Sequence, residues 1–182
     1  MSPGPTWTWL EGHPALDLAN TVKRTGWHER DLLTSPDDLD SWFDAAALPA
    51  PRPRTVDEQD LAAVVALRDP ALRLLRSAVG RGPWLAADVA AVNSTLLAAP
   101  EVVLVGDAPG ASVRQPLGRS SPLTLLLARL AADVREACGR PDLAFCDAPG
   151  CGQLFYRHRP NQAWCGPPCG NRATAGRSVP YG

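Results

Sequence analysis

CDAPGC at residues 146–151 and CGPPC at residues 165–169 decide the fold of the C-terminal part of this chain. Proline and glycine inside each stretch favour a tight turn between its two cysteines. A loop of thirteen residues separates the stretches, and this arrangement lets the two cysteine pairs converge on one ion. The spacing therefore predicts a tetrahedral Zn²⁺ site whose ligands are Cys146, Cys151, Cys165 and Cys169.

Two disulfides are the alternative use of four cysteines, and they require an oxidising compartment. The N-terminal run MSPGPTW lacks a charged region followed by an apolar segment, so it does not resemble a secretory signal. The longest apolar stretch, residues 123–134, is interrupted by Arg129 and Asp133, which argues against a membrane span. We therefore expect a cytoplasmic protein with reduced thiols and no membrane partner.

Length and charge divide the chain into two parts. A chain of 182 residues, 45% of them hydrophobic, is long enough for one ordinary domain and a small module. Residues 1–145 carry 14 basic and 18 acidic side chains, whereas residues 146–182 carry four arginines and one aspartate. We predict a helical domain over 1–142 and a zinc finger over 143–182, whose small core needs metal for stability.

Helix signals dominate the first part of the chain. A helix is expected over residues 14–25, where apolar side chains recur near helical spacing. Ser35-Pro36 and Thr55-Val56-Asp57-Glu58 are N-terminal helix signals. The second of these helices is expected to end at Asp69-Pro70, because proline lacks the amide that an interior turn requires.

The later helices flank a short β segment. One amphipathic helix is expected where apolar residues recur at helical spacing, at Leu85, Val89, Val92 and Leu96. Another helix is expected to begin at Ser121-Pro122. Between them, residues 101–116 contain two strand-forming runs around a glycine-bearing turn. The expected fold class is therefore mainly α with a small β-hairpin (α+β), followed by a four-cysteine zinc finger.

Two motifs at opposite ends of the chain resemble one known architecture. Cys169-Gly170-Asn171-Arg172, preceded by Trp164-Cys165 and by Cys151–Phe155, resembles the CGNR zinc finger. HPALDLANT at residues 13–21 is similar to the opening motif of the ABATE domain. The resemblance spans nearly the whole chain. It implies a stress-induced transcription regulator with a mostly helical ABATE domain and a finger that contacts double-stranded DNA.

The basic side chains of the finger are the candidate DNA contacts, because arginine pairs bidentately with phosphate and with guanine. Arg172 has the alternative role of donating hydrogen bonds to the zinc thiolates or bracing the finger against the acidic body. The loop between the cysteine pairs and the basic runs are shorter than in the family pattern. So few arginines predict weak, salt-sensitive binding unless a homodimer presents two fingers. The candidates are Arg157, Arg159, Arg172 and Arg177.

Asp17, Asn20 and Arg24 fall at i, i+3 and i+7 of the first expected helix, so they are expected to share one face. They have two alternative roles. They form a hydrogen-bonded cluster that ties this helix to the body, or they supply the polar part of a pocket for a small-molecule effector.

The remaining candidates have structural explanations. Cys138 continues the apolar stripe of the last long helix, so we expect a core residue rather than a redox partner. His158 lies between the cysteine pairs, but four cysteines already complete a zinc shell. Phe145, Phe155 and Trp164 flank the cysteines and are expected to form the small core of the finger.

The sequence shows no catalytic constellation. Neither a nucleophile–base pair nor a phosphate-binding glycine loop stands out, and a closed four-thiolate zinc site has no open coordination position. We therefore expect no enzymatic activity. The leading hypothesis is a DNA-binding transcription regulator with a helical sensor or assembly domain. The alternative is a zinc-stabilised protein that binds a small molecule or another protein and does not bind DNA.

Overall fold

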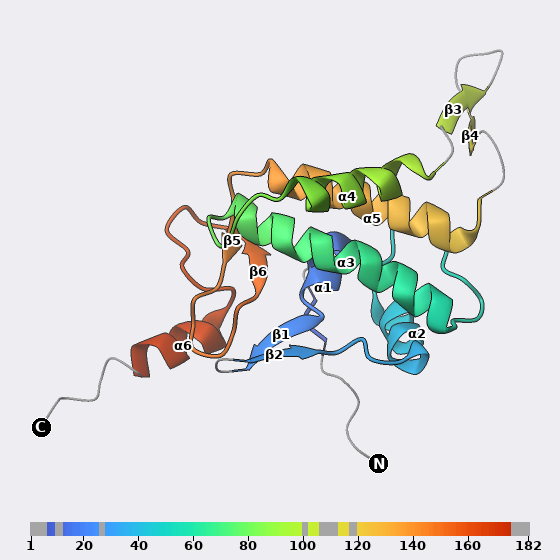
Figure 1. The fold of residues 1–182 in the computed structure, drawn as a ribbon. Helices are drawn as coiled ribbons and strands as arrows, with labels where there is room; N and C mark the ends of the chain where they lie inside the picture. The colour runs from blue at the N-terminus through green and yellow to red at the C-terminus, as the bar shows by residue number, and fades with distance from the viewer. Residues whose placement is uncertain are drawn as a thin grey trace, which may run out of the picture.

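Helices form most of this chain, as expected from its sequence. The computed structural model describes residues 7–9, 13–25, 28–99, 102–105, 113–116 and 120–175. Three long helices, α3 (Glu58–Ala78), α4 (Ala86–Leu97) and α5 (Pro122–Cys138), pack against one another (Figure 1). The short helix α1 (Pro14–Ala19) contacts α3 and α5, and α2 (Pro36–Ala45) contacts α3. In the described part of the chain, no helix has both the length and the apolar character that crossing a bilayer requires.

The described residues contain three antiparallel hairpins rather than the single one expected. The hairpin expected over 101–116 is present as β3 and β4, which stand at one end of the long helices, whereas β5 and β6 lie at the other end (Figure 1). A last helix, α6 (Pro167–Ala175), carries the fourth cysteine of the finger. The strands are β1 (Val22–Thr25), β2 (His28–Asp31), β3 (Val102–Val105), β4 (Val113–Pro116), β5 (Leu143–Phe145) and β6 (Leu154–Tyr156).

Side-chain caps fix where the helices begin. The Ser35 hydroxyl accepts a hydrogen bond from the Asp38 amide at 3.2 Å, and Ser121 caps α5 in the same way. Helix α3 begins later than expected, because Asp57 rather than Thr55 is its N-cap. The Asp57 carboxylate accepts from two backbone amides of the first turn, which satisfies donors that have no partner inside the helix.

Two expected helix ends were wrong. The first helix ends at Ala19, because residues 22–25 pair with residues 28–31 as β1 and β2. Helix α3 does not end at Asp69-Pro70 but continues to Ala78. Leu67 and Leu74, on either side of the proline, are both buried in the main core. Burial of the whole apolar stripe therefore outweighs the helical hydrogen bond that Pro70 cannot donate.

Candidate metal centre

The four cysteines of the C-terminal part converge on one point. Their Sγ atoms all lie within 4.8 Å of one another, at 3.6 Å between Cys151 and Cys165 and 3.4 Å between Cys165 and Cys169. Zn–S bonds of about 2.3 Å place tetrahedral sulfurs roughly 3.8 Å apart, whereas disulfide sulfurs are about 2.05 Å apart. All five cysteines of the chain are free thiols. The donor set and its spacing fit a four-thiolate zinc site, as predicted.

The first cysteine pair is held by a tight turn after β5. The Cys146 amide donates to the Gln153 carbonyl at 2.9 Å, and the Cys146 carbonyl accepts from the Gly152 amide at 3.1 Å. Gly150 and Gly152 both have a φ of 70°, a left-handed conformation that side chains with a Cβ adopt at a cost. The turn therefore brings the sulfurs of Cys146 and Cys151 to the same side of the loop.

The second pair sits at the start of α6. The Cys169 amide donates to the Gly166 carbonyl at 3.1 Å, and the Cys165 amide donates to Cys146 Sγ at 3.4 Å. Arg172 lies one helical turn after the last cysteine, and its Nη2 donates to Cys169 Sγ at 3.1 Å. Such donors stabilise thiolates around a metal. The structure thus places Arg172 in contact with the metal site, in addition to its exposure on the surface.

The thiols of this cluster have strongly different pKa values. Burial raises the pKa of Cys146 to about 11. The hydrogen bond from the Cys165 thiol lowers the pKa of Cys151 to about 5, and donating that bond raises the pKa of Cys165. Without a cation, this small space favours protonated thiols around one thiolate. A bound zinc ion supplies the positive charge that lets all four sulfurs be thiolates.

The hairpin β5–β6 connects the metal centre to the helical body, because its two faces belong to two cores. Leu143, Leu154 and Tyr156 are buried in the main core of the helices. Ala144 and Phe155, which are Cα partners in the hairpin, are buried in a second core with the cysteines. Successive side chains of a β-strand point to opposite faces. The hairpin therefore forms a wall that the two cores share.

Aromatic side chains divide between these two cores. Phe155 is buried among the cysteines, and Trp164 packs against that cluster, as expected for the core of the finger. Phe145, by contrast, packs against the main core. The expectation that it belongs to the finger core was wrong, because it points to the opposite face of β5 from Ala144. Cys138, outside the metal cluster, packs against the main core as predicted.

Asn20 joins α1 to the metal-bearing hairpin. Its Nδ2 donates to the Leu154 carbonyl at 2.9 Å, and its Oδ1 accepts from the Leu154 amide at 2.9 Å. The amide side chain thus pairs with β6 as a neighbouring strand would, and both partners are buried. The residue follows the last turn of α1 as its C-cap. Asn20 therefore ties the N-terminal motif to the finger.

The three residues predicted to share a helix face do not do so. Asp17 is buried on α1, whereas Arg24 lies on β1 and is exposed. The expected face does not exist, because the helix ends before Asn20. Arg24 instead lies against the first cysteine turn: a Cβ on Gly152 would stand 2.9 Å from the Arg24 Cβ.

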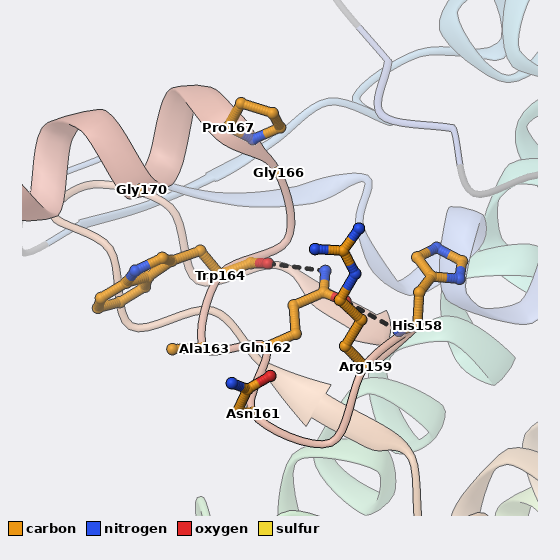
Figure 2. Close-up of a pocket in the computed structure, with 9 residues that line it drawn as sticks. All are labelled: His158, Arg159, Asn161, Gln162, Ala163, Trp164, Gly166, Pro167 and Gly170. Atoms are coloured by element: carbon orange, nitrogen blue, oxygen red, sulfur yellow. Dashed lines mark hydrogen bonds between the residues drawn. The ribbon is translucent and has the colours of Figure 1, made fainter.

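An open groove of about 520 Å³ runs beside the metal centre (Figure 2). The Gln162 side chain holds its loop, accepting from the His158 amide at 2.8 Å and donating to the Trp164 carbonyl at 3.0 Å. His158 is exposed on this loop and is not one of the four grouped metal ligands. The groove is lined by His158, Arg159, Asn161, Gln162, Ala163, Trp164, Gly166, Pro167 and Gly170.

Two of the predicted DNA contacts lie at this loop. Arg159 lines the groove and Arg157 is exposed beside it, its Nε donating to the Gln162 carbonyl at 3.2 Å. Arg177 lies outside the described residues. Asn161 and Gln162, which also line the groove, were not predicted from the sequence. Their position between two arginines and a tryptophan was the only available signal, and it is a weak one.

Comparison with known proteins gives two family matches. The model ABATE, described as "Putative stress-induced transcription regulator", matches residues 12–140. The model of the CGNR zinc finger matches residues 143–178. No curated protein matches the chain. The first match covers more than half of the sequence, and the second contains all four cysteines of the metal centre.

Proposed function

The chain belongs to the ABATE family and carries a CGNR zinc finger, and from this premise we propose that it is a DNA-binding transcription regulator. The observation that carries the proposal is the open groove beside the metal centre. Arg159, His158 and the half-buried Trp164 line it, together with residues at the start of α6 (Figure 2). The planar guanidinium of an exposed arginine such as Arg159 matches the oxygens of a phosphate group.

Helix α6 supplies side chains of the kind that read base edges. Asn171 and Arg172 are exposed on it, and asparagine and arginine pair bidentately with adenine and guanine in the major groove. Arg172 gives one Nη2 hydrogen bond to Cys169, which leaves further N–H groups of its guanidinium for DNA. In this proposal, zinc positions α6 and the flanking loop contacts phosphate.

Charge distribution supports the finger as the part that touches DNA. Residues 1–145 carry more acidic than basic side chains, and residues 146–182 carry the reverse. Few arginines imply few released counterions and hence weak binding by one finger. We therefore propose a homodimer that presents two fingers, with the helical body as the assembly or effector-sensing part.

The same proposal assigns the protein a non-enzymatic role in the cytoplasm. Four thiolates close the coordination shell of zinc, so the metal has no position for an attacking water. Reduced thiols are maintained in that compartment. The alternative, a zinc-stabilised protein that binds a small molecule or a protein without touching DNA, would be favoured by burial of the loop arginines against the body. Arg157 and Arg159 are exposed.

Duplex DNA binding at two salt concentrations tests the proposal. The measurement compares zinc-loaded wild type with two variants of the loop, Arg157→Gln and Arg159→Gln. The control is Arg54→Gln, which changes an exposed arginine of the body. Each lost phosphate contact should reduce the slope of log affinity against log salt by about 1, and Arg54→Gln should leave it unchanged. A folded, zinc-loaded wild type without salt-dependent DNA affinity would overturn the proposal in favour of the alternative.

A further inference from the structure

A second cavity, of about 380 Å³, lies where the helical body meets the first cysteine turn. Hairpin β1–β2 supplies Arg24 and Glu29, the end of α3 and the following loop supply Arg76 and Arg81, and the cysteine turn supplies Asp147. Three guanidinium groups and two carboxylates therefore line one space. The sequence separates these residues by more than a hundred positions, so no local pattern indicated the cluster.

The positive charges of this cavity are only partly balanced. Arg76 pairs with Glu29 at 2.6 Å, and Arg81 pairs with Asp147 while its guanidinium lies 5.5 Å from the Phe145 ring centroid. Beyond the backbone pairing of β1 with β2, the Arg24 side chain has neither an ion pair nor a hydrogen bond among the described residues. Arg76 Nε is buried and has no acceptor in the described part of the protein. One guanidinium thus remains for a ligand, and the Arg76 side chain beside it contains a buried donor without an acceptor.

We propose that this cavity binds a phosphate group. The unpaired Arg24 guanidinium favours negative charge in the cavity. An anion that displaces Glu29 from Arg76 would also let the buried Nε find an acceptor, whose absence costs free energy. The planar fork of arginine matches the oxygens of phosphate. The residues that line this cavity are different from those that line the groove at Trp164.

The phosphate group would act on the junction between body and finger. It competes with Asp147 for Arg81 and with Glu29 for Arg76, and Asp147 directly follows the metal ligand Cys146. Its two sources are a free phosphate compound and the backbone of a bound duplex. Both have the same recognising chemistry, so the experiment separates them.

Calorimetric titration of the zinc-loaded full chain with inorganic phosphate and with pyrophosphate, in a chloride buffer, tests the site. Arg24→Gln should weaken pyrophosphate binding about tenfold or more, the effect of losing one charged hydrogen bond. Arg76→Lys, which keeps the charge but loses the fork, should also weaken it. Glu29→Gln should strengthen binding, because it removes the carboxylate that competes for Arg76.

Arg30→Gln is the matched control. Arg30 is exposed on β2 of the same hairpin, and its Cα partner is Lys23, whereas Arg24 faces Glu29. It therefore lies on the other face and should leave the affinity unchanged. The site is overturned when wild type binds neither anion and Arg24→Gln leaves duplex affinity unchanged. It is equally overturned when Arg30→Gln weakens binding as much as Arg24→Gln.

A duplex titration of the same variants identifies the source. Weaker pyrophosphate binding with unchanged duplex affinity in Arg24→Gln supports a free phosphate compound. Weaker duplex binding in Arg24→Gln, with pyrophosphate displaced by DNA, supports the DNA backbone. Arg159→Gln, in the other groove, should leave pyrophosphate binding unchanged in both cases, so failure of the finger proposal remains distinguishable from failure of this site.

Discussion

The helical body and the metal centre differ in what stabilises them. The body buries large apolar side chains, among them Trp42, Leu75 and Leu130, at 1% exposure or less. The second core consists of two alanines, one phenylalanine and three of the cysteines, with Trp164 and Cys165 packed against it. Apolar burial can hold the first core, whereas the second is too small to fold without metal.

The two regions nevertheless share a wall. Leu143, Leu154 and Tyr156 complete the main core from the finger side of the chain. The finger is therefore not a tethered module, because its hairpin β5–β6 contributes buried side chains to both cores. Substitutions that disturb only one of the two cores should separate the contribution of the metal from that of apolar burial.

Removal of zinc should have the largest effect. Structural zinc sites contribute about 10–16 kcal/mol in small peptides, so chelation or Cys146→Ser should unfold residues 146–169. Most helix should remain, because α3, α4 and α5 bury one another. The body should still lose stability, since β5–β6 covers its core.

Hydrogen exchange with and without chelator, together with circular dichroism and metal analysis, checks this result. Amides of residues 146–169 should lose protection, amides of α3 should keep most of theirs, and the metal content should fall from one per chain to none. Protection of the finger that survives complete loss of metal would contradict the dependence of the second core on zinc.

Asn20→Ala should have the next largest effect. It leaves the buried amide and carbonyl of Leu154 without partners, and each such group costs roughly 1–3 kcal/mol. We expect a loss of about 3 kcal/mol in the free energy of unfolding, together with faster zinc release to a competing chelator. Urea unfolding and chelator competition measure the two effects.

Asn93→Ala is the matched control, because Asn93 is exposed on α4. Its unfolding free energy should change by less than about 0.5 kcal/mol. Suppose that Asn20→Ala destabilises the chain without changing the rate of zinc release. Then α1 stabilises only the helical body, and the hairpin β5–β6 does not couple α1 to the metal centre.

Local chemistry explains which features could be predicted from the sequence. The zinc ligands follow from two cysteine pairs and the turns between them. The starts of α2 and α5 follow from Ser35-Pro36 and Ser121-Pro122, because a cap acts within its own turn. The hairpin at 101–116 follows from strand-forming residues around a glycine turn.

Features that depend on distant contacts were not predictable. Asn20 and Leu154 are 134 residues apart, so nothing near Asn20 indicates that its amide pairs with a strand. The same limit explains the continuation of α3 through Pro70, where tertiary contacts outweigh the local propensity. The end of α1 was missed for a different reason: residues 22–25 pair with residues 28–31, which are close in the sequence, and the helical spacing of 14–25 did not indicate that hairpin. The predicted ligand face of Asp17, Asn20 and Arg24 failed because it rested on that helix.

Gly152→Ala sharpens the comparison at the point where the regions touch. The new Cβ would stand 2.9 Å from Arg24 Cβ, at a φ of 70°. We expect a loss of about 2 kcal/mol, because the left-handed conformation costs roughly 1 kcal/mol and the close contact with Arg24 adds on the order of 1 kcal/mol. Gly80→Ala is the control: φ is 76° but nothing lies within 4 Å, so it should lose only the conformational part. Equal losses in urea unfolding would show that β1 moves away from the cysteine turn at no cost.

Cys138→Ala should have the smallest effect, because it changes the main core alone. Cys138 is half-buried against that core and is not one of the grouped metal ligands. We expect a loss of about 1 kcal/mol through reduced packing and an unchanged zinc content by elemental analysis. Burial raises the pKa of the thiol to about 11, so at neutral pH it is protonated and a poor nucleophile. Its alkylation rate, followed by peptide mass spectrometry in the wild type, should rise continuously with pH up to that value. Loss of zinc from the variant would place this thiol in the metal centre. Alkylation of Cys138 as fast as that of an exposed cysteine peptide at neutral pH would contradict its burial against the body.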